Sequence, residues 1–258
     1  MNVKTDKNGK KMKTLFPSLL SLAVMLAMTF GLSAKTLEMS FKTVPKTLAT
    51  AEAVNVVYVP GNTSGTLVTI TGPDDKVGNV KVKMKGTTLS IGMTIEAAGH
   101  RNNGDLVRGV KITVHTGLVT SFSASSASEI SCTSRLDYGN GAVNIDASSA
   151  ADVEFGFVKC GSLGVGTSSA CDVEIDRVEA ANVSLEASSA AEIEIDFIKA
   201  DRLEASASSC ADISVKGGAV GTLKAKANSG ADIDLHGMTA RTQSISKNSG
   251  GSVKIGTK

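Results

Sequence analysis

Ala147–Val153, which reads Ala-Ser-Ser-Ala-Ala-Asp-Val, recurs along the chain at a fixed interval and decides its fold. Copies follow every 20 residues, and an earlier copy lies 23 residues before it: Ala124–Ile130, Thr167–Val173, Ala187–Ile193, Ala207–Ile213, Ala227–Ile233 and Lys247–Val253. A short insertion around Tyr138–Gly141 is predicted to account for the longer first interval. Seven copies at this period are typical of a solenoid, in which each coil buries its apolar side against its neighbours.

Apolar residues alternate on both sides of each motif, which predicts β-strands that point every second side chain inward. The inward columns start with Val143, Ile145 and Ala147 before the motif and with Ala151, Val153 and Phe155 after it, and a third column holds Val158, Val178, Ile198 and Met238. We therefore predict an all-β chain that forms a single-stranded parallel β-helix with coils of about 20 residues.

Three parts are expected along the chain: a signal peptide at 1–34, an irregular N-terminal β region with the first coils at 35–118, and regular coils at 119–258. The last coil is worn, because Gly251 and Ser252 replace the usual alanine and acid and Lys247 takes an apolar position. The segment Ala97–Asp105 is predicted to be a flexible polar loop, and no stretch shows helical periodicity of useful length. Strands of the irregular part are expected at Asn55–Val59, Thr66–Thr71, Val80–Met84, Thr88–Met93 and Val110–Val114.

An export signal is predicted because five lysines precede an apolar run, Leu15–Leu32, that ends in the small residues Ser33 and Ala34. Translation starts at Met1 or at Met12 in this interpretation. A retained membrane anchor is the alternative, but the serines and threonines of the run favour cleavage after Ala34. We expect an exported protein that is periplasmic, on the outer surface or secreted, with no membrane span after cleavage.

Composition argues against nucleic acid as a partner. Removing residues 1–34 takes away five lysines and one aspartate, which leaves 22 bases against 24 acids. The mature chain then has no basic excess to attract phosphates. Aromatic residues make up 3% of the chain and tryptophan is absent, so stacking platforms for bases or sugars are scarce.

Four cysteines in an exported chain suggest disulfides, but the repeat register argues against them. Cys171 and Cys210 fall two coils apart, about 10 Å at ~4.8 Å per strand, beyond the ~7 Å limit for bridged Cα atoms. Cys132 falls in the inward column of Phe155. We predict unpaired, buried thiols that pack as small apolar side chains.

Two polar features flank each corner. Serines repeat at the corner from Ser149 to Ser249, and short polar side chains there are expected to satisfy turn backbone groups rather than to act as nucleophiles. After the corner, carboxylates fall into outward columns of a candidate binding face: Asp152, Glu154, Asp172, Glu174, Asp176, Glu192, Glu194, Asp196, Asp212, Asp232 and Asp234. Stacked carboxylates repel by about 0.9 kcal/mol per pair at ~4.8 Å even in water.

Several interpretations of these acids remain. The repulsion between the stacked carboxylates is tolerated on a solvated face, or it is offset by a divalent cation, by a cationic partner, or by one of four bases, Lys159, Arg177, Lys199 and Lys216. Calcium is possible, although the Gly-rich turns of calcium-binding β-rolls are absent. Paired acids also suggest a glycosidase, but no acid lies in an apolar pocket and no aromatic subsite accompanies it. We assign no catalytic, cofactor or metal residues.

The corner repeats resemble the auto-transporter adhesin head GIN domain family, over about Ala53 to Ile255. The resemblance includes the strands Val54–Val59, Leu67–Ile70, Thr88–Ile91 and Val110–Val114 before the first corner. The glycine typical of the family's corners stands here only at Gly230 and Gly250, so it marks turn geometry and not a site. The resemblance implies a β-helical fold and a bacterial envelope or secreted setting, and no catalytic motif.

Our hypothesis from the sequence is an exported, non-enzymatic β-helical protein, adhesin-like or an envelope scaffold, that binds an unknown protein or glycan. The acidic columns and Ala97–Asp105 are the candidate contact regions. The alternative is a carbohydrate-active β-helix enzyme, a hydrolase or lyase. A self-assembling filament is a third hypothesis. The irregular last coil argues against it, because such a coil discourages end-to-end stacking.

Overall fold

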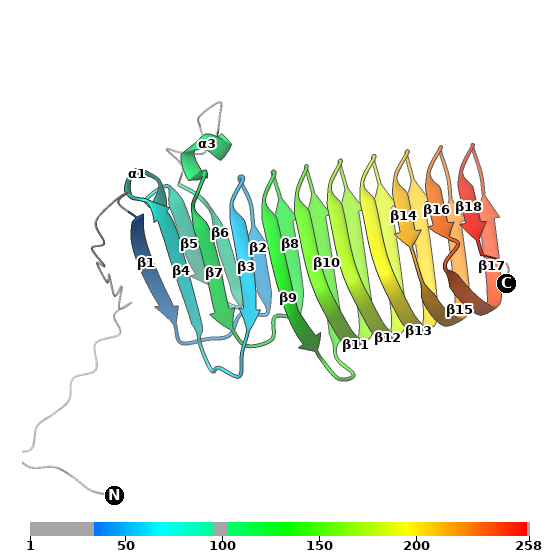
Figure 1. Ribbon diagram of the computed structural model, residues 1–258, viewed down its shortest axis with the longest axis horizontal. Helices are drawn as coiled ribbons and strands as arrows, with labels where there is room; N and C mark the ends of the chain where they lie inside the picture. The colour runs from blue at the N-terminus through cyan, green and yellow to red at the C-terminus, as the bar shows by residue number, and fades with distance from the viewer. Residues whose placement is uncertain (1–33, 95–102, 257–258) are drawn as a thin grey trace, which may run out of the picture.

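The computed structural model describes residues 34–94 and 103–256, which form one 18-stranded sheet wound into an elongated body (Figure 1). Three long strands, β11 (Asp152–Ser168), β12 (Asp172–Ser188) and β13 (Glu192–Ser208), lie parallel and one repeat apart. Asp152 lies opposite Asp172, and Asp172 lies opposite Glu192. The predicted all-β parallel solenoid with 20-residue coils is therefore confirmed.

The stack continues toward the C-terminus with shorter strands. These are β14 (Asp212–Val215), β15 (Gly218–Ala227), β16 (Asp232–Leu235), β17 (Met238–Lys247) and β18 (Ser252–Ile255). β15 pairs in parallel with β13 and β17, and β16 pairs with β14 and β18. In the last coil Lys247 and most of β17 are exposed, as expected of a worn end.

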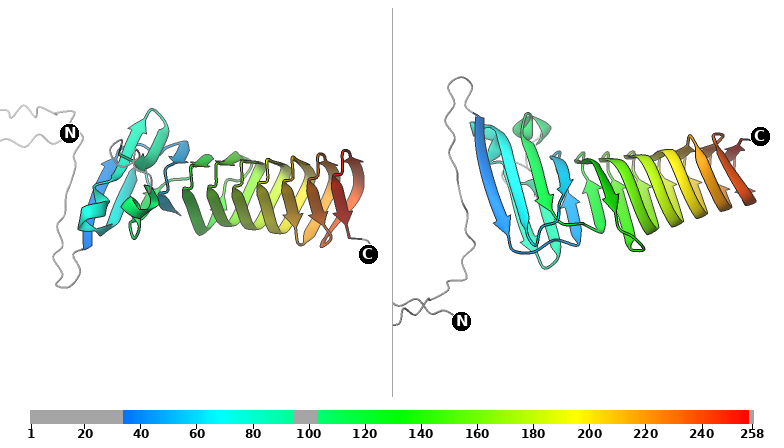
Figure 2. Two further views of the ribbon diagram at one scale, coloured as in Figure 1. Left: turned by 90° about the horizontal axis from the view of Figure 1, so that it is seen from above. Right: turned by 60° about the horizontal axis from the view of Figure 1, so that its bottom comes forward.

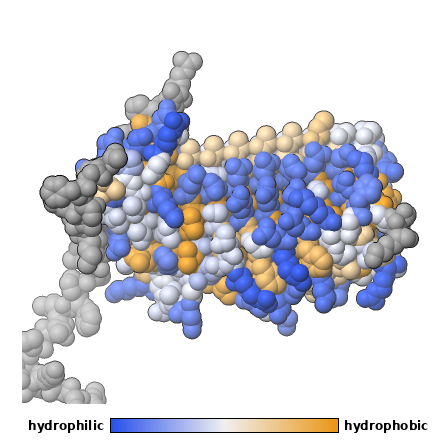
Figure 3. Space-filling view, in the orientation of Figure 1, coloured by the Kyte–Doolittle hydropathy of each residue, from blue (hydrophilic) through white to orange (hydrophobic). Residues whose placement is uncertain are grey.

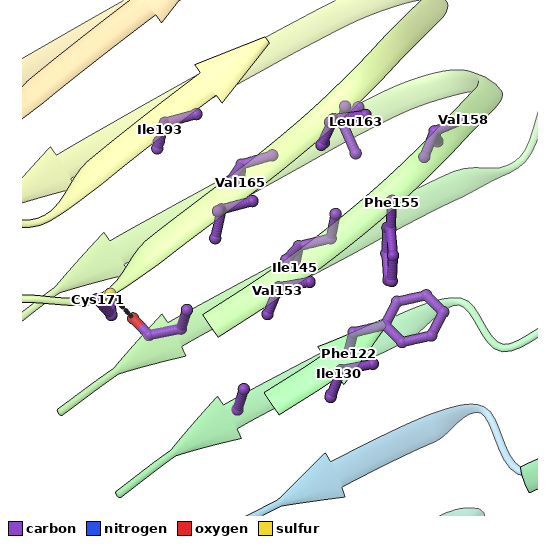
Figure 4. Packing of buried hydrophobic residues seen from close by; sticks show 14 of the residues in the cluster. Phe122, Ile130, Ile145, Val153, Phe155, Val158, Leu163, Val165, Cys171 and Ile193 are labelled. Carbon is purple, nitrogen blue, oxygen red and sulfur yellow. Dashed lines mark hydrogen bonds between the residues drawn. The ribbon is translucent and has the colours of Figure 1, made fainter. Parts of the chain in front are cut away.

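The core is a narrow column of apolar side chains between the walls of the solenoid (Figure 4). The third inward column of the sequence is buried as predicted, since Val158, Val178 and Ile198 are fully shielded and Met238 is 1% exposed. Phe122 packs between Tyr58 and Phe155, with ring centroids 5.4 Å and 4.8 Å away. The core therefore runs without a break from the N-terminal part into the regular coils.

The first regular coil carries the longer 23-residue interval. It comprises β8 (Ser121–Ser125) and β9 (Glu129–Asp137), and it stacks on β10 (Ala142–Ser148) and β11. One extra residue lies in a bulge of β9, where Cys132 pairs with Phe155 but Arg135 pairs with Phe157. The insertion at Tyr138–Gly141 therefore accounts for part of the slip only, and the bulge accounts for the rest.

The N-terminal part contains a corner that the sequence pattern did not reveal. β2 (Thr47–Thr50) and β3 (Asn55–Pro60) flank Glu52 and Ala53, whose φ angles are 64° and 58°. β2 pairs in parallel with β8, and β3 pairs in parallel with β9. Residues 47–60 therefore form a coil that stacks directly on the first regular coil, although about 60 residues separate them in the chain.

The described residues between these coils form, together with β1 (Ala34–Phe41), the N-terminal end of the body (Figure 2). β6 (Thr88–Met93) and β7 (Lys111–Thr116) pair in parallel with β2 and β3 and add one more layer. The strands β1, β4 (Thr66–Pro73) and β5 (Val80–Lys85) then run antiparallel to their neighbours. This mixed sheet ends the parallel stack.

Among the described residues, two short helices interrupt the strands of this end, where no helix is predicted from periodicity. They are α1 (Asp74–Val77) and α3 (Asn103–Val107). The prediction of a loop at Ala97–Asp105 is wrong for Asn103–Asp105, because these residues begin α3. This helix forms because its half-buried Leu106 and buried Val107 pack against the core. Its residues 97–102 lie outside the described residues, as does the predicted signal peptide except for Ala34.

The cysteine prediction is correct for three of the four thiols. Cys132, Cys160 and Cys171 are free and buried, whereas Cys210 is free and exposed. Cys210 takes the second corner position, where Ala150, Ala170 and Ala190 lie in other coils, and corner side chains point away from the core. The prediction that Cys210 is buried is therefore wrong.

Candidate functional site

The corners place pairs of residues in the left-handed backbone region. Ser149 and Ala150, for example, have φ angles of 59° and 57°. The backbone N–H of Ala150 donates to the carbonyl of Ser169 at 3.1 Å, and Ala170 donates to Ser189 in the same way at 3.1 Å. Backbone bonds between coils, and not the predicted local side-chain bonds, therefore satisfy these donors.

A catalytic role for the corner serines finds no support in their surroundings. His236 bonds to Asp234, with 2.7 Å between Nδ1 and Oδ1, and His115 lies in β7. Within residues 34–94 and 103–256 no hydrogen bond joins a corner serine to a histidine, and His100 lies outside the described residues. The exposed corners form the row along the upper edge of Figure 3, where Figure 1 places the turns.

The predicted acidic columns are in register on the wall that follows the corners, which we call the acidic wall. Hydrophilic side chains gather on this face in Figure 3. One column contains Asp152, Asp172, Glu192, Asp212 and Asp232 on adjacent strands. A second contains Glu154, Glu174 and Glu194, which Ser214 separates from Asp234, and Asp176 and Asp196 lie two residues further along their strands.

Glu129 extends the first column by one coil, and the sequence analysis did not include it. It lies opposite Asp152 at the start of β9. It comes two residues after the corner Ser126–Ala127, as Asp152 comes two residues after Ser149–Ala150. Applying the 23-residue interval to the acid as well as to the corner would have identified it.

Cations neutralise the C-terminal end of the acidic wall. Lys216 bonds to Glu194 and lies 2.9 Å from Asp196, and these carboxylates raise its pKa. Lys254 lies 3.1 Å from Asp232. A hydrogen bond from Ser252, together with Lys254, holds the pKa of Asp232 below its usual value.

The N-terminal half of the acidic wall has no such partners. Of the four cations proposed from the sequence, Lys159 pairs with Asp137 at 3.5 Å, and Arg177 pairs with Glu179 at 2.8 Å. Lys199 makes no ion pair within the described residues, so of these four cations Lys216 alone pairs with the wall.

Partial burial and neighbouring carboxylates change the acidity of this uncompensated half. Burial is the larger cause and carboxylate repulsion the smaller, and together they raise the pKa values of Glu129, Asp152, Glu174 and Glu192. The charged form of these groups is therefore disfavoured in the folded protein.

A column of alternating arginine and phenylalanine lies two residues beyond Phe155 and its equivalents, and the composition did not indicate it. The guanidinium carbon of Arg135 is 4.2 Å from the Phe157 ring centroid, and that of Arg177 is 4.5 Å from the Phe197 ring centroid. Arg177 also lies 5.8 Å from Phe157. Phe157 and Phe197 therefore share one surface column, in which Phe197 is 37% exposed.

The surface also has two open grooves. One groove of about 410 Å³ runs beside the corners and includes Asp146 and Glu186, both exposed. Neither carboxylate lies in an apolar pocket of the kind that surrounds a glycosidase general acid. A second groove, of about 570 Å³, is lined mainly by small residues such as Ala180, Ala200 and Gly221.

Within residues 34–94 and 103–256, no group of three His, Cys, Asp or Glu side chains is placed to hold a metal ion. None of the helices in that part combines the length and the apolar character that a bilayer crossing requires.

An elongated β-solenoid with a charged wall and open grooves is typical of a binding or scaffold protein. A family model described as "Putative auto-transporter adhesin, head GIN domain" matches residues 45–175 and 163–258. The chain therefore belongs to that family, as its corner repeats suggested.

Solved structures share the fold at low sequence identity. A putative adhesin from Bacteroides fragilis is 19% identical with a TM-score of 0.70, and the match covers 86% of this chain and 97% of that one. A putative adhesin from Parabacteroides merdae is 14% identical with a TM-score of 0.68, over 86% and 95% of the two chains. A putative lipid binding protein from Parabacteroides distasonis is 15% identical with a TM-score of 0.58, over 86% and 96%. No curated protein matches the chain.

Proposed function

We propose that this protein is an exported, non-enzymatic adhesin of the bacterial cell envelope, and that it binds a protein or glycan partner through the acidic wall. Membership of the adhesin head family and the adhesin-like relatives in Bacteroides and Parabacteroides support the adhesive role. The predicted signal at 1–34 supports export to the periplasm, the outer surface or the medium.

Like charges stack on the N-terminal half of the acidic wall. Asp152, Asp172, Glu154 and Glu174 lie in register on adjacent strands, yet no ion pair reaches them within the described residues. Their mutual repulsion opposes folding, because folding brings them to strand spacing, about 4.8 Å. A partner that carries complementary charge would relieve this repulsion, which explains why such a face is useful to a binding protein.

The test compares binding by the purified protein and by two charge variants on a glycan array and on a panel of immobilised surface proteins. The wall variant carries D172N, E174Q, E192Q and E194Q. The matched control neutralises four acids outside the wall through D75N, D146N, E186Q and D201N. We expect the control to bind as the unmodified protein does.

The wall variant is expected to bind its ligand at least about fourfold more weakly, because it loses four exposed ion pairs of about 0.2–1 kcal/mol each. Equal binding by the wall variant and the unmodified protein would mean that the adhesive surface lies elsewhere. Thermal melting of both variants checks that they remain folded.

A further inference from the structure

The arginine–phenylalanine column follows the register of the coils. Arg135 lies opposite Phe157, Phe157 opposite Arg177, and Arg177 opposite Phe197. All three ring–cation separations fall within the ~6 Å at which a guanidinium is attracted to the negative face of an aromatic ring. Cation and ring therefore alternate along the outside of the solenoid.

Each arginine in the column is also held by a carboxylate of its own coil. Arg135 lies 3.3 Å from Asp137, and Arg177 lies 2.8 Å from Glu179. An aromatic ring face and a carboxylate together recognise a guanidinium group, because its plane stacks on the ring and the N–H groups at its edge donate hydrogen bonds to the carboxylate. The molecule thus uses this geometry twice for its own side chains.

The alternation stops at Gly217, one coil after Phe197. An arginine would continue the pattern there, but glycine provides no side chain. A Cβ atom at Gly217 would lie 3.7 Å from Cδ2 of Phe197, which is van der Waals distance. Arg177 covers Phe197 from the preceding coil, so the side of the ring toward Gly217 is left without a stacking cation from the column.

The charges around this ring favour a cation over an anion. Asp176, Asp196 and Glu194 lie on the same wall, and Glu179 lies beside Arg177. The cations nearby are Arg177, Lys216 and Lys199, and Arg177 and Lys216 are already paired. In the next coil His236 is bonded to Asp234. The partners of Arg177 and Lys216 are Glu179, Glu194 and Asp196, so the four carboxylates exceed the three bases by one, and the acidic wall continues toward Glu174 and Glu192.

We propose that the side of Phe197 next to Gly217 binds an arginine side chain of a basic protein partner, which takes the place of the missing member of the column. This inference rests on the proposed adhesive function and identifies its ligand class as a basic polypeptide. Asp196, the residue before Phe197, pairs with Lys216 through Oδ1 at 2.9 Å, and its side chain is 52% exposed, so its Oδ2 can accept from the incoming guanidinium.

The test uses the purified full chain and a fluorescein-labelled peptide of alternating arginine and glycine, with binding followed by fluorescence polarisation. The comparison peptides replace every arginine with lysine or with glutamine. We expect the arginine peptide to bind most tightly and the glutamine peptide not to bind. Binding of the glutamine peptide as tightly as the arginine peptide would overturn the proposal and would favour a neutral ligand such as a glycan.

Three variants locate the binding position. F197L keeps an apolar side chain but removes the ring face, and it is expected to weaken binding of the arginine peptide about two- to fivefold. G217R supplies the missing guanidinium from the chain itself and should weaken binding at least as much. F157L is the matched control, because Arg135 and Arg177 already lie over Phe157, and it should leave the affinity unchanged.

The outcomes separate this inference from the proposed function. If the wall variant loses the arginine peptide but F197L and G217R bind it normally, the acidic wall is the binding surface and the Phe197 proposal is wrong. If F197L and G217R weaken binding while the wall variant does not, the Phe197 position is supported and the wall is not the adhesive surface. Unchanged melting temperatures show that the variants are folded.

Discussion

At the scale of single residues, the corner conformation accounts for the recurrent small side chains. Consecutive left-handed residues cost roughly 1–2 kcal/mol each when they carry a Cβ atom. The second corner position nevertheless holds alanine at Ala150, Ala170 and Ala190, and glycine only at Gly230 and Gly250. Backbone hydrogen bonds between successive corners hold these residues in place despite the cost.

This strain predicts opposite effects of substitutions at equivalent corners. Ala190 is exposed with φ 58°, so A190G is expected to raise the free energy of unfolding by up to about 1 kcal/mol. G230A should lower it by about 1 kcal/mol. A190V should lower it further, by about 2 kcal/mol, because a β-branched residue fits this region poorly.

Urea unfolding followed by circular dichroism measures all three corner variants. The contribution of strain would be refuted if A190G were less stable than the unmodified protein while G230A were more stable. The corner side chains are exposed, so these substitutions do not change the packing of the buried columns.

At the scale of the strands, the identical register of every coil aligns like charges. A side chain that faces outward on β12 meets its equivalents on β11 and β13, so one acidic position in the repeat becomes a column. Burial and, to a smaller extent, repulsion from the aligned carboxylates raise the pKa values of four acids: Glu129, Asp152, Glu174 and Glu192. The folded protein therefore takes up protons at a higher pH than the unfolded chain does.

Stability is consequently expected to increase as the solution is acidified from neutral pH toward about pH 5. A raised carboxyl pKa stabilises the folded state fully below the unfolded pKa, and this contribution is lost as pH rises through the folded pKa. At lower pH the trend reverses, because Asp137, Glu179 and Asp232 have lowered pKa values and lose their hydrogen-bonded or ion-paired charged forms.

Melting temperatures measured between pH 3 and pH 8 test this dependence. In the double variant E174Q/E192Q the increase from neutral to mildly acidic pH should be smaller, and the protein should be more stable at neutral pH. A melting temperature that falls steadily from pH 8 to pH 5 would be inconsistent with destabilising repulsion in the acidic wall.

At the scale of the whole molecule, the two ends of the stack are protected in different ways. At one end β5 pairs with β6 alone among the described strands, and its outward face carries Lys81, Lys83 and Lys85. Charged lysines on an edge strand discourage another chain from adding to the sheet. At the other end Lys247 breaks an apolar column, while Ile245 is 41% exposed.

Removing the edge charges is expected to promote association. The variant K81T/K83T/K85T should form oligomers at protein concentrations where the unmodified chain does not, as measured by size-exclusion chromatography with light scattering. K111T/K199T/K226T changes three lysines on strands that are paired on both sides, and it should behave as the unmodified protein. Equal association of both variants would indicate a loss of solubility through charge alone.

The repeat in the sequence was enough to predict the regular coils, their inward columns and the alignment of the acids. A periodic chain in a parallel solenoid places residue i next to residue i + 20, so local spacing determines the neighbours across strands. The same spacing would also have identified Glu129. The buried thiols Cys132 and Cys171 follow from their inward columns for the same reason.

Only the tertiary structure decided what the period does not determine. The coil at residues 47–60 stacks on residues 121–137 although a long insertion separates them, and no local pattern identifies contacts between distant segments. The partner of each surface cation likewise depends on side-chain geometry: Lys216 pairs with Glu194 of the acidic wall, whereas Arg177 pairs with Glu179. The exposed ring of Phe197 beside Gly217 emerged for the same physical reason, because stacking depends on neighbours in space that composition cannot show.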